Sequence, residues 1–373
     1  MRRVSVSMKW IAAAGPVAFA AVSCLVHAGQ LEPPGPVGST MQTAIRAANL
    51  PLTITAPGRY VLEEDIDAAG GGGITITSSN VTIDLRGHSL RNGTGDGIFA
   101  QNAALSASVQ NGTVSGWTGD GVDLGAAPNS QIVGIRSHGN GGDGIRIGFG
   151  GFVSECTARG NSVDGIEAAG FGTLISHCVA INNLAAGINV PNGPSSISHC
   201  TAYNNGTVGI GGTGVSVTVT DCAVRDNNED GIALGAAAIV SRCTAYSNGD
   251  AAGEDGISVG TASSVTDCTV ANNAEDGIDV IGDSFVARNN ADSNGVVEGA
   301  GIHATGGGNR IEGNNATDND RGFDVDGSGN LVIRNSAGGN FVEYSIVAGN
   351  TAGPIVTSAG IAASTNPHAN YEY

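Results

Sequence analysis

The sequence has very few lysines, aromatic residues and charges. Its 373 residues include one Lys, Lys9, and only 4% are aromatic and 13% charged. The absence of Lys after position 9 excludes a lysine base or Schiff base from the rest of the chain. Glycine, in contrast, is abundant at 60 residues, roughly double its ordinary share of about 7%. Because Gly costs about 1 kcal/mol per helix position, this composition disfavours a compact helical protein.

The chain also lacks the composition of a disordered or collagen-like protein. Hydrophobic residues make up 40% of it, with Ile and Val throughout, which is more apolar material than disordered chains contain. The glycines do not recur at every third position, as the collagen triple helix requires. A turn-rich all-β protein remains.

The N-terminal segment has the pattern of a secretory signal. A basic stretch over residues 2–9 precedes an apolar run over residues 10–26, and Ala28 fits a cleavage site. The apolar run is too short for a membrane span, and no second such run follows. We therefore predict a signal peptide over residues 1–28 and an exported protein, periplasmic or secreted, without a membrane span. A lipoprotein site at Cys24 is the alternative, but the expected branched aliphatic residue three positions earlier is missing.

The chain is strongly acidic. Its formal net charge is −18, and removal of residues 1–28, which hold three basic and no acidic residues, would leave −21. Phosphate binding needs a basic surface, so we expect neither nucleic acid nor an anionic membrane as a partner. Acidity of this kind favours the solubility of an exported protein, and calcium binding is the competing interpretation.

The chain is a repeat. Twelve pairs of Gly and an aliphatic residue or Phe recur at intervals of 21–25 residues, from Gly73-Ile74 to Gly322-Phe323, with a mean period of 22.6 residues. A period of this length indicates a solenoid, whose units cannot bury a core alone. Leucine-rich repeats have a similar period, but their Leu and Asn consensus is missing. Within each unit apolar residues alternate as in strands, and the Asn, Asp and Gly between them favour turns.

The pattern predicts an all-β parallel β-helix of about twelve coils over residues 54–340. Each strand would hydrogen-bond to its copy in the next coil, about 4.8 Å away. Residues 29–53 are expected to be a leader and N-terminal cap, with a short capping helix over Thr40–Asn49, where apolar residues have helical spacing. Residues 341–373, where the period fades, are expected to form a C-terminal cap.

Two columns of small or polar residues are expected to stack inside the coils. One register holds Cys156, Cys178, Cys200, Cys222, Cys243 and Cys268, followed by Asn289, Asn314 and Asn335. A second row, four residues before the repeat Gly, holds Asn140, Asn161, Asn183, Asn205, Asn227 and Asn273. Stacked Asn amides can bond to each other and to the turn backbone. Disulfides between adjacent Cys are sterically allowed, but the regular spacing favours a mostly reduced ladder.

Several segments resemble a known superfamily. PGRYVL at residues 57–62, SNVTIDLRGHSL at residues 79–90 and the repeated Asp-Gly-Ile are similar to the opening and the coils of pectate-lyase-like right-handed parallel β-helix proteins. The resemblance covers roughly residues 54–340 and implies a right-handed helix. The superfamily includes pectate lyases, polygalacturonases, alginate epimerases and lyases, and periplasmic copper-delivery proteins. Their catalytic motifs are missing here: Ile83-Asp84, for example, is followed by Leu85 where pectate lyases have His.

The residue after each repeat Gly-Ile is expected to face solvent, on the face where this superfamily places its catalytic groups. One polar cluster on it consists of Asp123, Arg146 and Glu167. Trp117 lies nearby in sequence and is predicted to stack on a sugar ring. We interpret these four residues as substrate-binding, and an exposed ion-pair ladder with a turn aromatic is the alternative.

Asp279, His303 and Asp324 occupy the same outward position on three consecutive coils, and we predict them to be catalytic. The two carboxylates would lie two strand spacings apart, near the separation of about 6.5–9.5 Å between carboxyl groups in inverting glycosidases. His303 between two carboxylates should have a raised pKa, which suits a proton donor or a substrate-positioning group. The alternative is an ordinary polar ladder on the surface.

Two other patterns suggest metal ligands. His177 and His199 precede Cys residues on adjacent coils, flanked by carboxylates, and such donors suit zinc or copper. The alternating charges that continue this row favour a structural role. Seven Asp precede the repeat Gly; they suit a tight turn, and calcium is the competing interpretation. We predict no metal or other cofactor, with calcium as the alternative.

The sequence thus predicts an exported, monomeric β-helix protein that binds or processes polysaccharide. Its reaction would be that of a polysaccharide lyase, an epimerase or a glycoside hydrolase. Enzymatic activity stays open, because the missing motifs and sparse aromatics equally fit a non-catalytic surface or matrix scaffold. A periplasmic metal-binding β-helix protein is a third interpretation.

Overall fold

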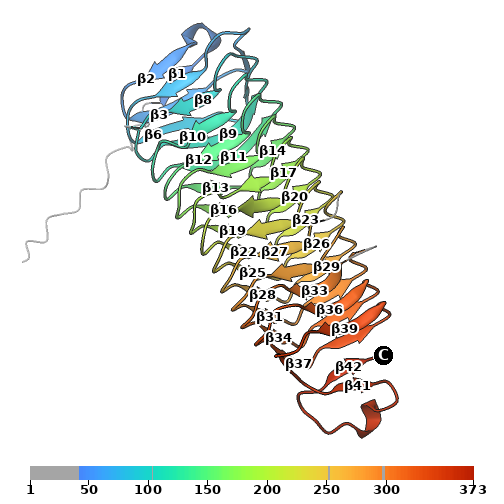
Figure 1. Ribbon diagram of the computed structural model, residues 1–373. Helices are drawn as coiled ribbons and strands as arrows, with labels where there is room; N and C mark the ends of the chain where they lie inside the picture. Colours follow the sequence, from blue (N-terminus) through green and yellow to red (C-terminus); the bar gives the residue numbers. More distant parts are fainter. Residues whose placement is uncertain (1–41, 103, 251–252, 296–298) are drawn as a thin grey trace, which may run out of the picture. The chain divides into compact units, whose positions relative to one another are not determined.

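The computed structural model describes residues 42–102, 104–250, 253–295 and 299–373. The predicted signal peptide over residues 1–28 lies outside these ranges. Residues 42–373 form three ladders of short parallel strands, stacked coil upon coil (Figure 1). Each ladder forms one face of the solenoid.

The repeated Gly-Ile pairs form one face, which we call the Gly-Ile sheet. Its fourteen strands, in stacking order, are β2 (Leu52–Ile54), β5 (Ile74–Ile76), β8 (Ile98–Ala100), β10 (Val122–Leu124), β12 (Ile145–Ile147), β15 (Ile166–Ala168), β18 (Ile188–Asn189), β21 (Ile210–Gly212), β24 (Ile232–Leu234), β27 (Ile257–Val259), β30 (Ile278–Val280), β33 (Ala300–Ala304), β36 (Arg321–Val325) and β39 (Val342–Ile346). The twelve predicted coils correspond to β5 through β36, and the structure adds one strand at each end.

The other two faces share two long strands. The second ladder consists of β1 (Gln42–Ile45), β3 (Gly58–Leu62), β6 (Val81–Asp84), β9 (Ser108–Ser115), β11 (Gln131–His138), β13 (Phe152–Ser154), β16 (Leu174–Ser176), β19 (Ser196–Ser198), β22 (Thr218–Thr220), β25 (Ile239–Ser241), β28 (Ser264–Thr266), β31 (Phe285–Ala287), β34 (Arg310–Glu312), β37 (Leu331–Ile333) and β40 (Thr351–Ala352). The third ladder consists of β4 (Ile66–Asp67), β7 (Ser89–Arg91), β9, β11, β14 (Thr157–Arg159), β17 (Val179–Ile181), β20 (Thr201–Tyr203), β23 (Ala223–Arg225), β26 (Thr244–Tyr246), β29 (Thr269–Ala271), β32 (Asn290–Asp292), β35 (Asn315–Thr317), β38 (Ser336–Gly338), β42 (Asn370–Glu372) and β41 (Ile355–Thr357). β9 and β11 pass through the corner and belong to both ladders.

The core is a stack of similar apolar side chains. On β30, for example, Ile278 and Val280 are completely buried, and Asp279 between them points outward. Full burial of such a side chain contributes about 1.5–3 kcal/mol. Each coil buries its apolar residues against those of the coils above and below, so the alternation along a strand fixes which residues face solvent.

The predicted Asn row is confirmed and is longer than predicted. Each side-chain amide nitrogen donates to the Oδ1 of the next residue along Asn140, Asn161, Asn183, Asn205, Asn227, Asn248, Asn273, Asn294, Asn319 and Asn340. Asn227 is 2% exposed and donates to Asn248 Oδ1 at 2.9 Å and to the carbonyl of Ala202 at 3.3 Å. Its own Oδ1 accepts the backbone N–H of Asn205 at 3.1 Å. The Asn ladder therefore satisfies the buried backbone at one corner of every coil that it crosses.

The six Cys also stack, buried, in the predicted register. Their thiols are free in the part of the chain that the structure describes, as the regular spacing predicts. The thiol of Cys200 donates to the carbonyl of Ser198 at 3.2 Å. The same column continues through Asn289, Asn314 and Asn335 to Asn370 of the C-terminal segment.

The predicted capping helix over Thr40–Asn49 is wrong. Residues 42–45 form strand β1, which pairs with β3, and only a 3-10 turn, η1 (Ala47–Asn49), follows. The first coil offers β3 as an open edge, and pairing with it satisfies backbone groups that a short isolated helix would leave exposed. Ile45 is fully buried as part of this strand. A second 3-10 turn, η2 (Ile361–Ala363), lies near the C-terminus.

No helix within the described residues has the length and apolar character needed to cross a membrane.

We predict that Asn227→Ala lowers the free energy of unfolding by about 3 kcal/mol, because it leaves buried backbone groups of Asn205 and Ala202 without partners, at about 1–3 kcal/mol each. Chemical denaturation followed by circular dichroism measures the loss. Asn228→Ala is the matched control. The Asn228 side chain is next in sequence and exposed, so its loss should change the denaturation midpoint little. Equal effects of the two substitutions would contradict the role assigned to the ladder.

Candidate functional site

The three residues predicted to be catalytic lie side by side on the Gly-Ile sheet. Asp279 on β30 is in register with His303 on β33, and His303 is in register with Asp324 on β36. The flanking residues of each strand point into the core, so the three side chains point outward. The regular register thus brings together groups that are 45 residues apart in the sequence.

His303 is the centre of the cluster. Its Nδ1 lies 2.7 Å from Asp276 Oδ2 and 3.7 Å from Asp279 Oδ1, and its Nε2 lies 3.4 Å from Asp326 Oδ2. The His303 side chain is 23% exposed, Asp276 7% and Asp279 18%, whereas Asp326 is 58% exposed. The imidazole is thus held on one side by a buried carboxylate and faces solvent on the other.

Sequence reasoning did not assign Asp276 and Asp326 to this site. Asp276 belongs to the row of Asp that precede the repeat Gly, and its Oδ1 accepts the backbone N–H of Ala300 at 2.5 Å. That hydrogen bond holds the turn in place and orients Oδ2 of Asp276 toward His303. Asp326 follows β36, two residues after Asp324 on the same side. The alternation of the strand is the one signal that would have pointed to Asp326.

Two carboxylate oxygens of the cluster are buried and accept no hydrogen bond. They are Asp279 Oδ1 and Asp324 Oδ1. The other oxygen of Asp324 pairs with Arg321 at 2.9 Å. Buried polar atoms almost always have a partner, so these two atoms mark a place where a proton, a cation or a ligand would be stabilised.

The site holds an acid and a base in contact. Burial raises the pKa of Asp279 from 3.8 to about 6, opposed by the nearby His303. The hydrogen bond to Asp276, together with the charges of Asp276, Asp279 and Asp324, raises the pKa of His303 from 6.5 to about 9 despite its burial. Near neutral pH, Asp279 is therefore mostly ionised and His303 protonated. Such a pair can accept one proton and donate another.

The first predicted cluster forms an ion-pair ladder. Asp123 on β10, Arg146 on β12 and Glu167 on β15 are in register. Arg146 Nε lies 2.6 Å from Glu167 Oε2, and its terminal nitrogen lies 3.9 Å from Asp123 Oδ2. Asp123 also accepts the backbone N–H of Gly125 at 2.7 Å. The charges of this cluster thus largely neutralise one another. Its substrate-binding role stays a prediction.

The prediction that Trp117 stacks on a sugar is wrong. Trp117 is 2% exposed, and its indole N–H donates to the carbonyl of Leu90 at 3.2 Å. Its backbone N–H donates to Asn140 Oδ1 at 3.1 Å, so Trp117 occupies the position before the first Asn of the ladder. That position points into the core, and the indole fills it.

The two His on the Cys side of the coils stack on each other. The rings of His177 and His199 are 4.8 Å apart and nearly parallel. The neighbouring Asp221 forms a bidentate ion pair with Arg242, with both contacts at 2.8 Å. Among the described residues, groups of three metal-type donors occur around His303, with Asp276 and Asp279 or with Asp324 and Asp326, and none includes His177 or His199.

The Asp before the repeat Gly act in the turns, as we favoured. Asp120 Oδ1 accepts the backbone N–H of Asp143 at 2.7 Å, and Asp143 Oδ1 accepts that of Asp164 at 2.9 Å. The same bond links Asp230 to Asp255 at 2.6 Å. Burial raises the pKa of Asp143 to about 8 and that of Asp255 to about 9, and neighbouring Asp add to both shifts. Calcium binding by this row stays an untested alternative.

The three parallel ladders and the inward Asn column define a parallel β-helix. The family model for the right handed beta helix region matches residues 57–174, 164–310 and 236–366. The chain belongs to this family, and its coils are right-handed.

Two solved structures illustrate the likeness in fold. The A-module of mannuronan C-5 epimerase AlgE4 from Azotobacter vinelandii is 14% identical over 82% of this chain and 88% of its own, with a TM-score of 0.48. A mutant tailspike protein of E. coli bacteriophage HK620, in complex with a pentasaccharide, is 11% identical over 89% of this chain and 72% of its own, with a TM-score of 0.46. A search of curated proteins found no match to the chain.

We predict that the His303 imidazole titrates near pH 9, as measured by NMR of the labelled protein. Asp276→Asn should bring this pKa down toward 6.5, because the hydrogen bond that His303 donates to the Asp276 carboxylate is the largest cause of the shift. The stabilisation from protonated His303 is complete below pH 6.5 and is lost as the pH rises through 9. The His303→Gln variant identifies the resonance. A midpoint near 6.5 in the unmodified protein, or no change in Asp276→Asn, would contradict the assignment.

Proposed function

We propose that the chain is exported and processes a polysaccharide on the Gly-Ile sheet, with Asp279 as base and His303 as acid. The observation that carries this proposal is the geometry of the site: His303 Nδ1 lies 2.7 Å from Asp276 Oδ2 and 3.7 Å from Asp279 Oδ1, a buried oxygen that accepts no hydrogen bond. His303 and Asp279 are both on an outward face of the solenoid.

A polymer is the substrate that suits this face. The Gly-Ile sheet presents one outward residue per coil, about 4.8 Å apart, along fourteen strands. An extended chain of sugars lying along the axis would contact several coils at once, and only the units near β30 to β36 would meet the acid and the base. Polar outward residues elsewhere on the sheet would then position the chain.

The pair can serve three related reactions. In elimination, Asp279 would take a proton from a sugar carbon and His303 would protonate the departing oxygen. In epimerisation, His303 would return a proton to the same carbon from the other face. In hydrolysis, Asp279 would activate water while His303 protonates the glycosidic oxygen. Asp276 and Asp326 each have an oxygen beside an imidazole nitrogen of His303, and we assign them a positioning role that keeps the imidazole protonated.

A bound divalent cation is the second candidate function of the same site. It is supported by the unpartnered oxygens of Asp279 and Asp324 and by the two donor groups around His303. A mixed set of imidazole and carboxylate suits zinc better than calcium, which takes oxygen ligands. Loss of turnover in EDTA and its recovery with zinc would favour this candidate over metal-free acid–base catalysis.

We predict that Asp279→Asn and His303→Gln each lower turnover at least a hundredfold, the lower range of what general acid or base catalysis contributes. The substrate is found by screening a polysaccharide panel for unsaturated products, for new reducing ends and for changed epimer ratios. Unsaturated products would indicate elimination, new reducing ends without unsaturation would indicate hydrolysis, and a changed epimer ratio would indicate epimerisation.

Ser258→Ala is the matched control, because Ser258 occupies the same outward column one coil earlier and carries no titratable group. It should keep nearly full activity, and circular dichroism should show that all three variants are folded at the assay temperature. Full activity in Asp279→Asn and His303→Gln would eliminate this site. Absence of any product across the panel would favour the scaffold interpretation.

A further inference from the structure

A different face of this acidic protein carries unpaired positive charge. Of the thirteen Arg among the described residues, ten form ion pairs with carboxylates. Arg86 instead bonds to the side chain of Gln42. Arg136 and Arg159 have neither kind of partner, although the chain has 34 acidic residues to offer. Both are exposed and lie on the third ladder.

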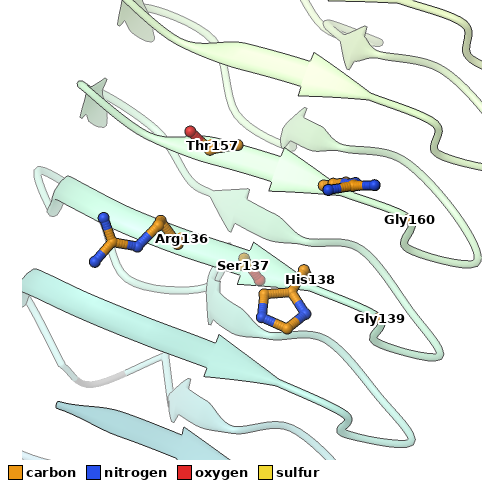
Figure 2. A pocket seen from close by; sticks show the side chains of 7 residues that line it. Arg136, Ser137, His138, Gly139, Thr157 and Gly160 are labelled. Atoms are coloured by element: carbon orange, nitrogen blue, oxygen red, sulfur yellow. The ribbon is translucent and has the colours of Figure 1, made fainter.

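These two Arg line one cavity. A cavity of about 450 Å³ is lined by Arg136, His138, Thr157 and Arg159, together with backbone of the turns that follow β11 and β14. Arg136 and His138 project from the same side of β11, beside Thr157 of the next strand (Figure 2). His138 is in register with Arg159. We call this group of four residues the basic cavity.

The surroundings of the basic cavity do not neutralise it. The third-ladder segments of the strands from β9 through β29, all of them described, contain no Asp or Glu. The nearest carboxylates in sequence are Glu155, which is exposed at the corner before β14, and Asp143 and Asp164, which are buried in the turns before the Gly-Ile sheet. In a chain of net charge −18, an acid-free face with two unpaired guanidinium groups is set apart from the rest of the surface.

Aromatic rings continue the same column of the face. The register runs from Arg159 through Ile181, Tyr203 and Arg225 to Tyr246. Arg225 lies 4.3 Å over the ring of Tyr203, whereas Tyr246 is 46% exposed. An exposed tyrosine ring offers an apolar face with a polar edge, which suits a sugar ring. Guanidinium groups with unused donors suit carboxylate or sulfate.

We propose that this face binds an anionic carbohydrate chain, with its carboxylate or sulfate groups in the basic cavity and a sugar ring on Tyr246. A chain lying along the axis from Arg136 to Tyr246 would cross five strand spacings, roughly 24 Å. The face belongs to another ladder than His303, so the interaction does not depend on the proposed catalytic site. By binding an acidic polysaccharide, this face would keep the protein on its polymer while the proposed reaction takes place on the Gly-Ile sheet.

Isothermal titration calorimetry on the His303→Gln protein tests the proposal without turnover. The probes are an oligogalacturonate of ten sugars, a dextran sulfate oligomer and a maltodextrin of the same length, and a single-stranded DNA 20-mer. We expect binding of an anionic sugar and none of the maltodextrin. The tighter of the first two probes identifies carboxylate or sulfate as the group recognised. Affinity should fall with added salt, since the contacts are exposed.

Arg136→Gln and Arg159→Gln should each weaken binding about tenfold, as expected for the loss of charge-assisted hydrogen bonds, and Tyr246→Ala about threefold. Arg288→Gln is the matched control: Arg288 is exposed, pairs with Asp267 and lies outside this face, and its loss changes the net charge equally. Unchanged affinity in both cavity variants, no binding of either anionic sugar, or tighter binding of the DNA would each overturn the proposal. The calorimetry uses a protein in which His303 is already replaced, so a lack of binding would not contradict the proposed reaction. A lack of turnover would likewise not contradict binding at this face.

Discussion

Hydrogen bonding between equivalent residues of successive coils is the interaction on which the rest of this structure depends. A solenoid with coils of about 22 residues must turn its backbone three times per coil, and each turn buries peptide groups that a strand ladder does not satisfy. Here the Asn ladder meets that need at one corner, as Asn227 does for Asn205 and Ala202. The Asp of the turns do the same at another corner, as Asp143 does for Asp164. A residue that cannot continue the pattern, such as Trp117, is found at the end of the ladder.

The same stacking that satisfies the backbone also concentrates charge. When like residues recur at one spacing, carboxylates come within a few ångströms of each other in partly buried turns, and their protons become harder to remove. Asp230 and Asp255 belong to such a row, and both have a raised pKa. His303 in the outward column contacts Asp276 of this row, and the charges of Asp276, Asp279 and Asp324 favour its cationic form. The chemistry of the site thus results from placing Asp279, His303 and Asp324 on consecutive strands beside a turn row that already holds Asp276.

Much of this arrangement could be predicted because the repeat sets the register. The spacing of the Gly-Ile pairs places Asp279, His303 and Asp324 on consecutive strands, and the Asn and Cys columns follow from the same arithmetic. Two kinds of feature could not be derived in this way. Contacts across a turn, such as that between Asp276 and His303, depend on which oxygen the backbone holds, which the repeat does not specify. The ends of the solenoid also lack a repeat to follow, so that the apolar spacing within residues 40–49 suggested a helix where the open edge of β3 selects a strand.

The pH dependence of kcat/KM on a responsive polysaccharide tests the central claim most directly, namely that Asp279 and His303 form an acid–base pair set by their neighbours. The account predicts a bell-shaped profile that rises through about pH 6, as Asp279 ionises, and falls through about pH 9, as His303 loses its proton. In Asp276→Asn, the upper limb should move to lower pH, because the hydrogen bond to Asp276 is the largest cause of the raised pKa of His303. A profile without these two limbs, or an upper limb that Asp276→Asn leaves unchanged, would contradict the account.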